Sequence, residues 1–157
     1  IADTGLNIYN SASAAGAENM GAAEKTLSDE MLLSDISRLL SPVPIGIAAY
    51  GKLPLMLYRC CPVRNGKGCS ECGGKSTITD RKGTVFPVQC RKNHSELLNS
   101  VPVWLADRLS ELKALDFLTL YFTDETAEQT EKIINAYTSG GNAPEKYTRG
   151  LYYRGVY

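Results

Sequence analysis

Four of the five cysteines lie within thirteen residues, in the stretch CCPVRNGKGCSEC that begins at Cys60, and the fifth, Cys90, follows soon after. Thiolates are ligands of zinc and of iron–sulfur clusters. A secreted disulfide scaffold spreads an even number of cysteines along a small chain, whereas here the number is odd and the cysteines cluster. The pattern favours metal or cluster binding in a reducing cytoplasm over disulfides, and unliganded structural thiols are the remaining alternative.

The spacing of two of these cysteines is that of a metal knuckle, in which a tight turn directs two thiolates at one ion. Cys69 and Cys72 have this spacing, and neighbouring glycines allow the backbone to fold closely around a centre. Cys61 enters from the end of a preceding strand. Adjacent residues of a strand face opposite ways, so Cys60 and Cys61 cannot easily both be ligands. We therefore expect Cys60 to be the spare thiol.

A predicted hairpin brings in the last cysteine. The runs STITD and TVFPVQC flank Arg81-Lys82-Gly83, which is typical of two strands joined by a short turn. If Asp80 pairs with Thr84, then Cys90 lies near residue 74 and beside Cys72. The predicted ligands of the metal or cofactor are therefore Cys61, Cys69, Cys72 and Cys90. Such a set suits either an iron–sulfur cluster or tetrahedral zinc, and spacing alone does not separate them.

Other candidate groups have ordinary alternatives. The single histidine, His94, is expected to be an exposed residue at a helix start rather than a base, and the chain has neither a G-x-S-x-G elbow nor an H-E-x-x-H motif. Asp80 and Arg81 either shape the turn or orient a cluster or substrate. Near the end, aromatic and basic residues alternate, which suits either RNA stacking or, preferably, a terminal strand with solvated ends; they are Arg149, Tyr152, Tyr153 and Arg154.

The helices and strands that position these groups are predicted from the spacing of apolar residues and from the residues that cap or end each element. Strands are predicted at GLNIYNS, IGIAAYG, LPLMLYR and FLTLYF, and Pro87 indicates that the second hairpin strand lies on an edge. Helices are predicted over 12–20, 28–40 and about 105–112, and a final helix is capped by Asp124 and ended by Gly140-Gly141. Alternation of this kind implies an α/β fold with a mostly parallel sheet and an inserted cysteine-rich β-hairpin.

Length and charge limit the number of domains, the size of the sheet and the kinds of partner that the sequence predicts. The 157 residues suit a single domain, 1–157, with the cysteine loop and hairpin at 60–90 inserted in it. A closed eight-stranded barrel usually needs about 250 residues, so an open sheet of about four or five strands is expected. Basic and acidic residues balance at 17 each, and no apolar run suits a membrane helix. The start without Met and without a signal sequence indicates a piece of a longer protein.

Several stretches resemble the collagenase-like peptidase family, the thirty-second among peptidases of unknown catalytic type. They are YGKLPLMLYRCCPV, GCSECGG, ITDRKGTVFPVQC and the NS of LLNS, and the similarity runs from LNIYNSASA to YTRGLYYRGV. The resemblance implies a partial barrel-like fold, the later half of the family's α/β domain. Some members carry an iron–sulfur cluster on four cysteines, and some are required for hydroxylation of bases in tRNA or rRNA; others are described as collagen-degrading proteases.

The resemblance therefore implies an iron–sulfur protein that supports RNA modification. The alternatives are a protease (hydrolase), as the family name states, and a non-catalytic zinc-stabilised module. The family pattern has a glutamate near the end of the strand before the cysteines, whereas this chain has IAAYG there, so no role is carried over to that position. Cutting a barrel exposes strand edges, so self-association through them is also expected.

Overall fold

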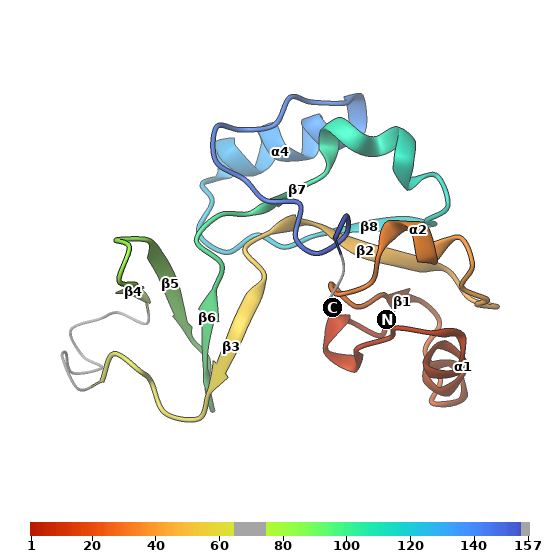
Figure 1. Cartoon of the computed structure of the whole chain (residues 1–157), viewed down its shortest axis with the longest axis horizontal. Coiled ribbons are helices and arrows are strands. Elements are labelled where there is room, and N and C mark those ends of the chain that lie inside the picture. The colour runs from red at the N-terminus through yellow and green to blue at the C-terminus, as the bar shows by residue number, and fades with distance from the viewer. Residues whose placement is uncertain (65–74, 155–157) are drawn as a thin grey trace. The chain divides into compact units, whose positions relative to one another are not determined.

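The computed structural model describes residues 1–64 and 75–154, and the chain divides into two compact units (Figure 1). The first, here called the α/β unit, is made of Ile1–Gly51 and Val103–Tyr157. The second, here called the inserted unit, is Lys52–Pro102 and interrupts the first in the sequence. All five cysteines belong to the inserted unit.

The α/β unit is built on a four-stranded sheet. Its elements are η1 (Thr4–Leu6), α1 (Ser11–Asn19), β1 (Lys25–Thr26), α2 (Leu33–Ile36), β2 (Ile45–Gly51), β7 (Val103–Trp104), η2 (Ala106–Leu112), β8 (Phe117–Leu120) and α4 (Ala127–Ser139). Strands β1 and β8 both pair with β2 in parallel, and β7 pairs with the end of β2 in antiparallel orientation. Ala2 adds a parallel bridge to Lys25 of β1.

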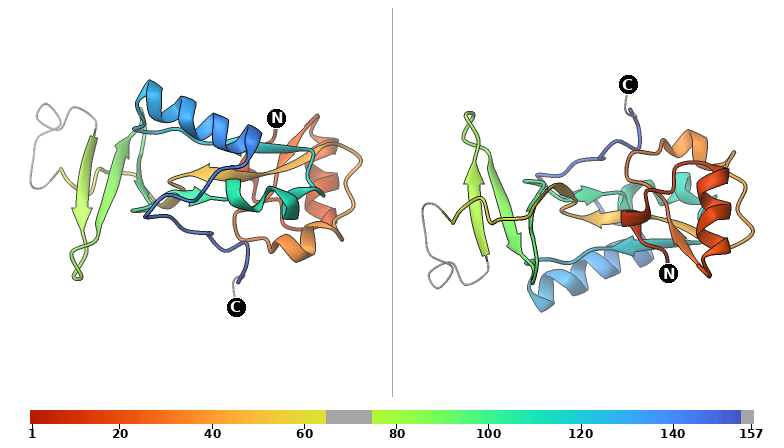
Figure 2. Two further views of the ribbon diagram at one scale, coloured as in Figure 1. Left: turned by 90° about the horizontal axis from the view of Figure 1, so that it is seen from above. Right: turned by 90° about the horizontal axis from the view of Figure 1, so that it is seen from below.

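The predicted central strand is confirmed, because every residue of β2 is buried. Gly46 is required there: a Cβ at this position would lie 2.4 Å from the ring of Phe117 on β8. Helix α4 lies over β8 in both views of Figure 2 and packs through Ile133, Ala136 and Tyr137 against the buried cluster of Tyr50, Trp104 and Ala106. The Tyr137 hydroxyl donates to Ala49 O at 2.5 Å and accepts from the Leu105 N–H at 2.9 Å.

Three predictions about secondary structure in the α/β unit are wrong. The helix predicted over 28–40 shortens to α2, because the Leu27 and Ser28 N–H groups bond to Gly46 O and Ile8 O and hold that segment against the sheet. The strand predicted at GLNIYNS is replaced by η1, which the Asp3 side chain caps. The final helix is present, but its cap is Thr126 rather than Asp124, with a capping box to Gln129.

The inserted unit is a second sheet of four antiparallel strands in the order β3-β6-β5-β4. The strands are β3 (Pro54–Tyr58), β4 (Lys75–Thr79), β5 (Val85–Cys90) and β6 (Ser95–Leu98). The predicted β4–β5 hairpin is confirmed: the Asp80 N–H donates to Thr84 O at 3.0 Å. The pairing of Cys90 with residue 74 lies outside the described residues.

Two predictions about this sheet are wrong. His94 does not start a helix, because the Arg91 N–H bonds to His94 O and closes a tight turn from β5 into β6. Nor is β5 an edge strand. Its Pro87 is tolerated because pairing with β6 begins only at Val88, so the missing N–H costs no ladder bond on that side.

The described residues thus form a mixed α/β structure with two sheets and no closed barrel. Among them, no helix has the length and apolar character that a membrane crossing requires.

Candidate functional site

Two of the predicted ligands, Cys61 and Cys90, come together in the inserted unit. Cys90 is the last residue of β5 and pairs across the turn with Ser95, the first residue of β6. The side chains of Cys90 and Ser95 both hydrogen-bond to the Cys61 thiol, and the Ser95 hydroxyl also donates to the Cys90 sulfur at 3.7 Å. Residues separated by 29 positions therefore bring their thiols close enough to interact.

Backbone hydrogen bonds favour the thiolate form of Cys61. The pKa of the Cys61 thiol is lowered chiefly by a hydrogen bond from the Val63 backbone, with smaller contributions from Cys90, Ser95 and the Arg64 backbone. The turn is closed by a bond from the Arg64 N–H to Cys61 O at 3.2 Å. Because N–H donors favour the thiolate, which is the form that binds metals, this turn suits a ligand.

The other cysteines have different positions. Cys60 is exposed, and β3 ends at Tyr58, so the strand alternation used to separate Cys60 from Cys61 does not extend to them. The contact with Cys90 nevertheless singles out Cys61. Cys69 and Cys72, the other two predicted ligands, lie outside the described residues. Within residues 1–64 and 75–154 there is no group of three or more His, Cys, Asp or Glu side chains that could hold a metal ion.

The chemistry of the Cys61 and Cys90 thiols fits a thiolate-bound metal or cluster. They contact each other, and backbone donors favour the charged form of one. Ser95 is buried beneath the partly exposed thiols, and its hydroxyl orients the Cys90 sulfur. A complete centre would need two further ligands, which the C-x2-C pair at Cys69 and Cys72 would provide.

His94 and its partners lie on the opposite face of the same hairpin. Gln89 pairs with Glu96 on the strands that carry Cys90 and Ser95, and adjacent residues alternate between faces. The Glu96 carboxylate is 3.1 Å from His94 Nε2 and accepts from Arg91 Nε at 3.2 Å. This draws the exposed imidazole to Glu96.

The remaining predicted groups have structural partners. Asp80 Oδ1 accepts from the Lys82 and Thr84 N–H groups at 2.8 Å each, which is the chemistry of the hairpin turn. Arg149 binds both carboxylate oxygens of Asp107 at 2.6 Å and holds the pKa of that carboxyl below its usual range. Tyr152 is buried, so it is not available for stacking on a nucleic acid.

A group of ionisable side chains that sequence reasoning missed lies in the α/β unit. The Tyr152 hydroxyl donates to Ala48 O of β2 at 2.9 Å and lies 3.3 Å from Asp29 Oδ1, while the Tyr121 hydroxyl bonds to Asp3. Burial raises the pKa of Asp29 to about 6 against the Tyr152 hydrogen bond, and the charges of Asp3 and Glu30 add to the rise.

This group follows the ends of parallel strands: Asp3 follows the bridge at Ala2, Asp29 follows β1 and Tyr121 follows β8. The carboxyl ends of parallel strands share one edge of a sheet, where ligands of α/β proteins commonly bind. In the sequence, Asp29 had the appearance of a first-turn acid of a helix. No local pattern pairs it with Tyr152, 123 positions away.

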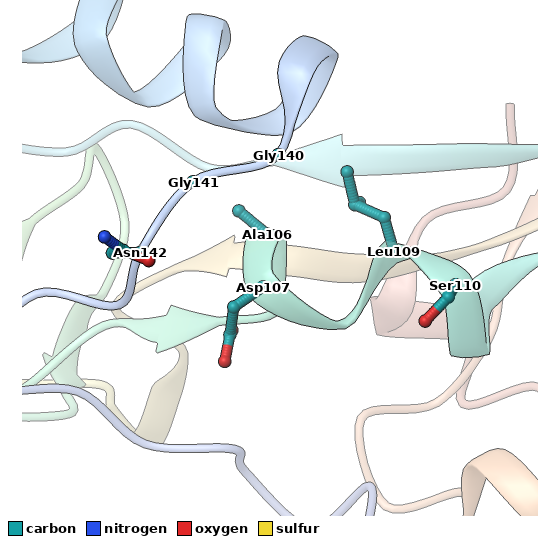
Figure 3. Close-up of a pocket in the computed structure, with 7 residues that line it drawn as sticks. All are labelled: Ala106, Asp107, Leu109, Ser110, Gly140, Gly141 and Asn142. Carbon is teal, nitrogen blue, oxygen red and sulfur yellow. The ribbon is translucent and has the colours of Figure 1, made fainter.

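A shallow cavity of about 440 Å³ lies beside η2. Figure 3 shows Ala106 and Leu109 pointing toward the segment that follows α4, whereas Asp107 and Ser110 point away from it. A Cβ at Gly141 in this wall would lie 2.5 Å from Cβ of Ala136, so the glycine serves the packing of the chain against α4. The cavity therefore lacks a convergent set of polar groups.

Comparison with known proteins gives no relative: no protein-family model, no curated protein and no solved structure matches the chain.

Proposed function

We propose that the chain is the cluster-binding part of a collagenase-like peptidase family protein that supports hydroxylation of tRNA or rRNA bases. The observation that carries the proposal is that Cys61 and Cys90 come together beside Ser95, which pairs with Cys90 across the turn and donates to its sulfur at 3.7 Å. The resemblance of the cysteine loop and of ITDRKGTVFPVQC to that family supplies the functional class. The sheet of β1, β2 and β8 is in keeping with a partial barrel-like domain completed by other residues of a longer chain.

In this proposal, Cys61, Cys69, Cys72 and Cys90 hold an iron–sulfur cluster, which supplies electron transfer when bound. The chain's own groups prepare the site. The Val63 backbone stabilises the Cys61 thiolate, and the Ser95 hydroxyl orients the sulfurs of Cys61 and Cys90. Hydrogen bonds to the sulfurs tune the reduction potential of such clusters.

The same thiol geometry fits a second candidate, a zinc-stabilised structural module. Tetrahedral zinc takes four thiolates and contributes directly to folding. Absorption separates the two. Protein purified without air that is brown, with broad absorption in the visible, supports the cluster, and colourless protein with stoichiometric zinc supports the module.

The protease alternative finds little support in the described groups. His94 is held by Glu96, on the face of the hairpin opposite Cys90 and Ser95. A cysteine bound to metal is a poor nucleophile, because its lone pairs are engaged. We expect the chain not to digest gelatin.

RNA is the proposed partner of the intact protein, and a cytoplasmic location is proposed with it, because ligand cysteines need a reducing compartment. Self-association through sheet edges is a further proposal. β3 is an edge strand, and its Leu55, Met56 and Leu57 are exposed. Unprotected apolar edges pair readily with other strands. Light scattering over a concentration series tests this, and a strict monomer at the highest concentration contradicts it.

The functional proposal is tested in the host. Deleting the gene and analysing tRNA and rRNA nucleosides by mass spectrometry should show loss of one hydroxylated base, restored by the intact gene and not by a Cys61→Ser, Cys90→Ser copy. A Cys60→Ser copy, which changes the neighbouring thiol, should restore the modification. An unchanged nucleoside profile in the deletion strain would refute the proposal.

A further inference from the structure

The charges of the chain are divided unequally between its two units. The inserted unit, residues 52–102, holds 9 Lys and Arg side chains against 3 Asp and Glu, a formal net charge of +6. The α/β unit holds 8 basic side chains against 14 acidic ones, a formal net charge of −6. The even balance of the whole chain therefore conceals a strongly basic unit. An excess of Lys and Arg confined to one unit is typical of surfaces that bind polyanions.

The two described sulfurs that interact lie at one end of the sheet in the inserted unit, here called the thiol end. Tyr58, the last residue of β3, and Cys90, the last residue of β5, both pair with Ser95, the first residue of β6. Cys61 lies at this end too, because its thiol hydrogen-bonds to the side chains of Cys90 and Ser95. The segments that directly follow β3 and β5 are therefore at the thiol end.

Three exposed basic side chains come from these two segments, and they are here called the basic rim. Arg59 is the first residue after β3, and Arg64 closes the turn at Cys61 through its backbone N–H. Lys92 lies in the turn between β5 and β6. All three side chains are exposed. The basic rim thus belongs to the same end of the sheet as the thiols.

The acidic residues of the inserted unit leave the basic rim without ion pairs. The Asp80 carboxylate lies in the turn at the other end of the β4–β5 hairpin, where it accepts from backbone N–H groups. Glu96 is engaged by Arg91, at 3.2 Å from its Nε. No member of the basic rim makes an ion pair with any residue that the structure describes. Its three positive charges are therefore available to a partner from solution.

We propose that the basic rim binds the phosphate backbone of single-stranded RNA and so presents a base to the cysteine site. Arg and Lys side chains make most of the charged contacts to phosphates, and such contacts position a strand without reading its sequence. The binding is therefore independent of base identity at the rim. This inference rests on the proposed function for its choice of RNA, and it adds the surface that holds the strand.

The number of charges in the rim sets the salt dependence of binding. Each phosphate that is neutralised releases condensed counterions, so the affinity for a single strand falls with a logarithmic slope of about 0.7 per contact. Three contacts give a slope of about −2. The affinity should therefore fall about 20-fold between about 50 mM and about 200 mM KCl.

The test uses the whole chain, purified without air, and a fluorescein-labelled oligouridylate of about 12 nucleotides, followed by fluorescence anisotropy. We expect saturable binding with a dissociation constant of about 10 μM at about 50 mM KCl, and the salt slope given above. Poly-L-glutamate tests for an acidic protein partner and phosphatidylserine vesicles test for a membrane. No saturable binding, a slope near zero, or tighter binding to either of these than to the RNA would overturn the proposal.

Two double variants locate the surface. Arg59→Gln with Lys92→Gln should weaken RNA binding about tenfold at about 50 mM KCl and reduce the salt slope to about −0.7. Arg81→Gln with Lys82→Gln removes the same charge from exposed residues of the same unit, in the turn at the other end of the β4–β5 hairpin. This control should change the affinity less than about twofold. Equal losses in the two double variants would contradict the assignment of the rim.

Failure of this inference and failure of the proposed function give different results. A chain that does not bind the RNA, while the deletion strain loses a hydroxylated base, would overturn the role of the basic rim alone. Binding that is weakened by Arg59→Gln with Lys92→Gln would support the rim, even if an unchanged nucleoside profile in the deletion strain refuted the proposed function.

Discussion

At Asp29, burial and neighbouring charge act on the same carboxyl group. Water is largely excluded from it, and Asp3 and Glu30 add unfavourable charge, so its pKa rises from 3.8 to about 6 despite the hydrogen bond from Tyr152. The folded state therefore holds the proton more tightly than the unfolded chain. This contribution to stability is fully present below about pH 4 and is lost as the pH rises through about 6.

Asp29→Asn should remove the loss of stability that ionisation of Asp29 causes as the pH rises. The ionised carboxylate costs the folded state about 2–3 kcal/mol at pH 7, and an amide keeps an acceptor for the Tyr152 hydroxyl without the charge. We expect the free energy of unfolding at pH 7.5 to rise by about 1–2 kcal/mol, with a much smaller change at pH 4. Urea unfolding at both pH values measures this. Glu145→Gln, at an exposed position, is the matched control, and a Asp29→Asn effect equal at both pH values would contradict the account.

At the scale of elements, helix α4 depends on its first turn. The Thr126 side chain accepts from the Gln129 N–H at 3.3 Å, and Gln129 Oε1 accepts from the Thr126 N–H at 2.8 Å. Thr126→Ala removes the acceptor of the Gln129 N–H, keeps the backbone N–H that donates to Gln129 Oε1, and should lower the free energy of unfolding by about 1 kcal/mol. Thr126→Ser keeps the hydroxyl and should cost much less. Denaturant unfolding followed by circular dichroism makes the comparison, and equal losses in the two variants would contradict the capping role.

Elements with a strong local signal were predictable. The apolar run of β2, the turn between β4 and β5 and the helix ended by Gly140 all appear where the sequence places them. Elements decided by distant partners were not. The leucine-striped segment 28–40 loses most of its helix because Leu27 and Ser28 are hydrogen-bonded to Gly46 and Ile8.

The candidate sites show the same division. The hairpin register predicted Cys90 near residue 74 and Cys72, which lie outside the described residues. Cys61 comes close to Cys90 for another reason: Tyr58 of β3 and Cys90 of β5 both pair with Ser95 of β6. Ser95 was missed because β6 was not predicted, although Cys90 and Ser95 are cross-strand partners. The Asp29–Tyr152 pair joins segments 123 positions apart, and no periodic pattern records such a contact.

At the scale of the whole molecule, the two units are joined at one point of the sheet. Gly51, the last residue of β2, and Val103, the first of β7, are paired neighbours, so the inserted unit leaves and returns where a hairpin turn would fit (Figure 1). A two-residue Asn-Gly turn suits such a pair.

Replacing residues 52–102 by Asn-Gly should therefore leave a folded α/β unit. We expect cooperative thermal unfolding, dispersed NMR signals and retained protection of the β2 amides from exchange, because β2 finds its partners β1, β7 and β8 within this unit. The shortened chain lacks all five cysteines and should bind no metal. A chain with neither dispersed signals nor a cooperative transition would show that the α/β unit depends on the inserted one.

The central claim is that Cys61 and Cys90 are ligands of one centre and that Cys60 is not. Metal and acid-labile sulfide analysis of the whole chain, purified without air, tests it most directly when Cys61→Ser, Cys90→Ser and Cys60→Ser are compared at equal protein concentration. We expect the first two variants to lose most of the metal and Cys60→Ser to keep it, because among the three cysteines that the structure describes Cys61 and Cys90 interact, whereas Cys60 is exposed. Full metal content in Cys61→Ser and Cys90→Ser, or its loss in Cys60→Ser alone, would contradict the account.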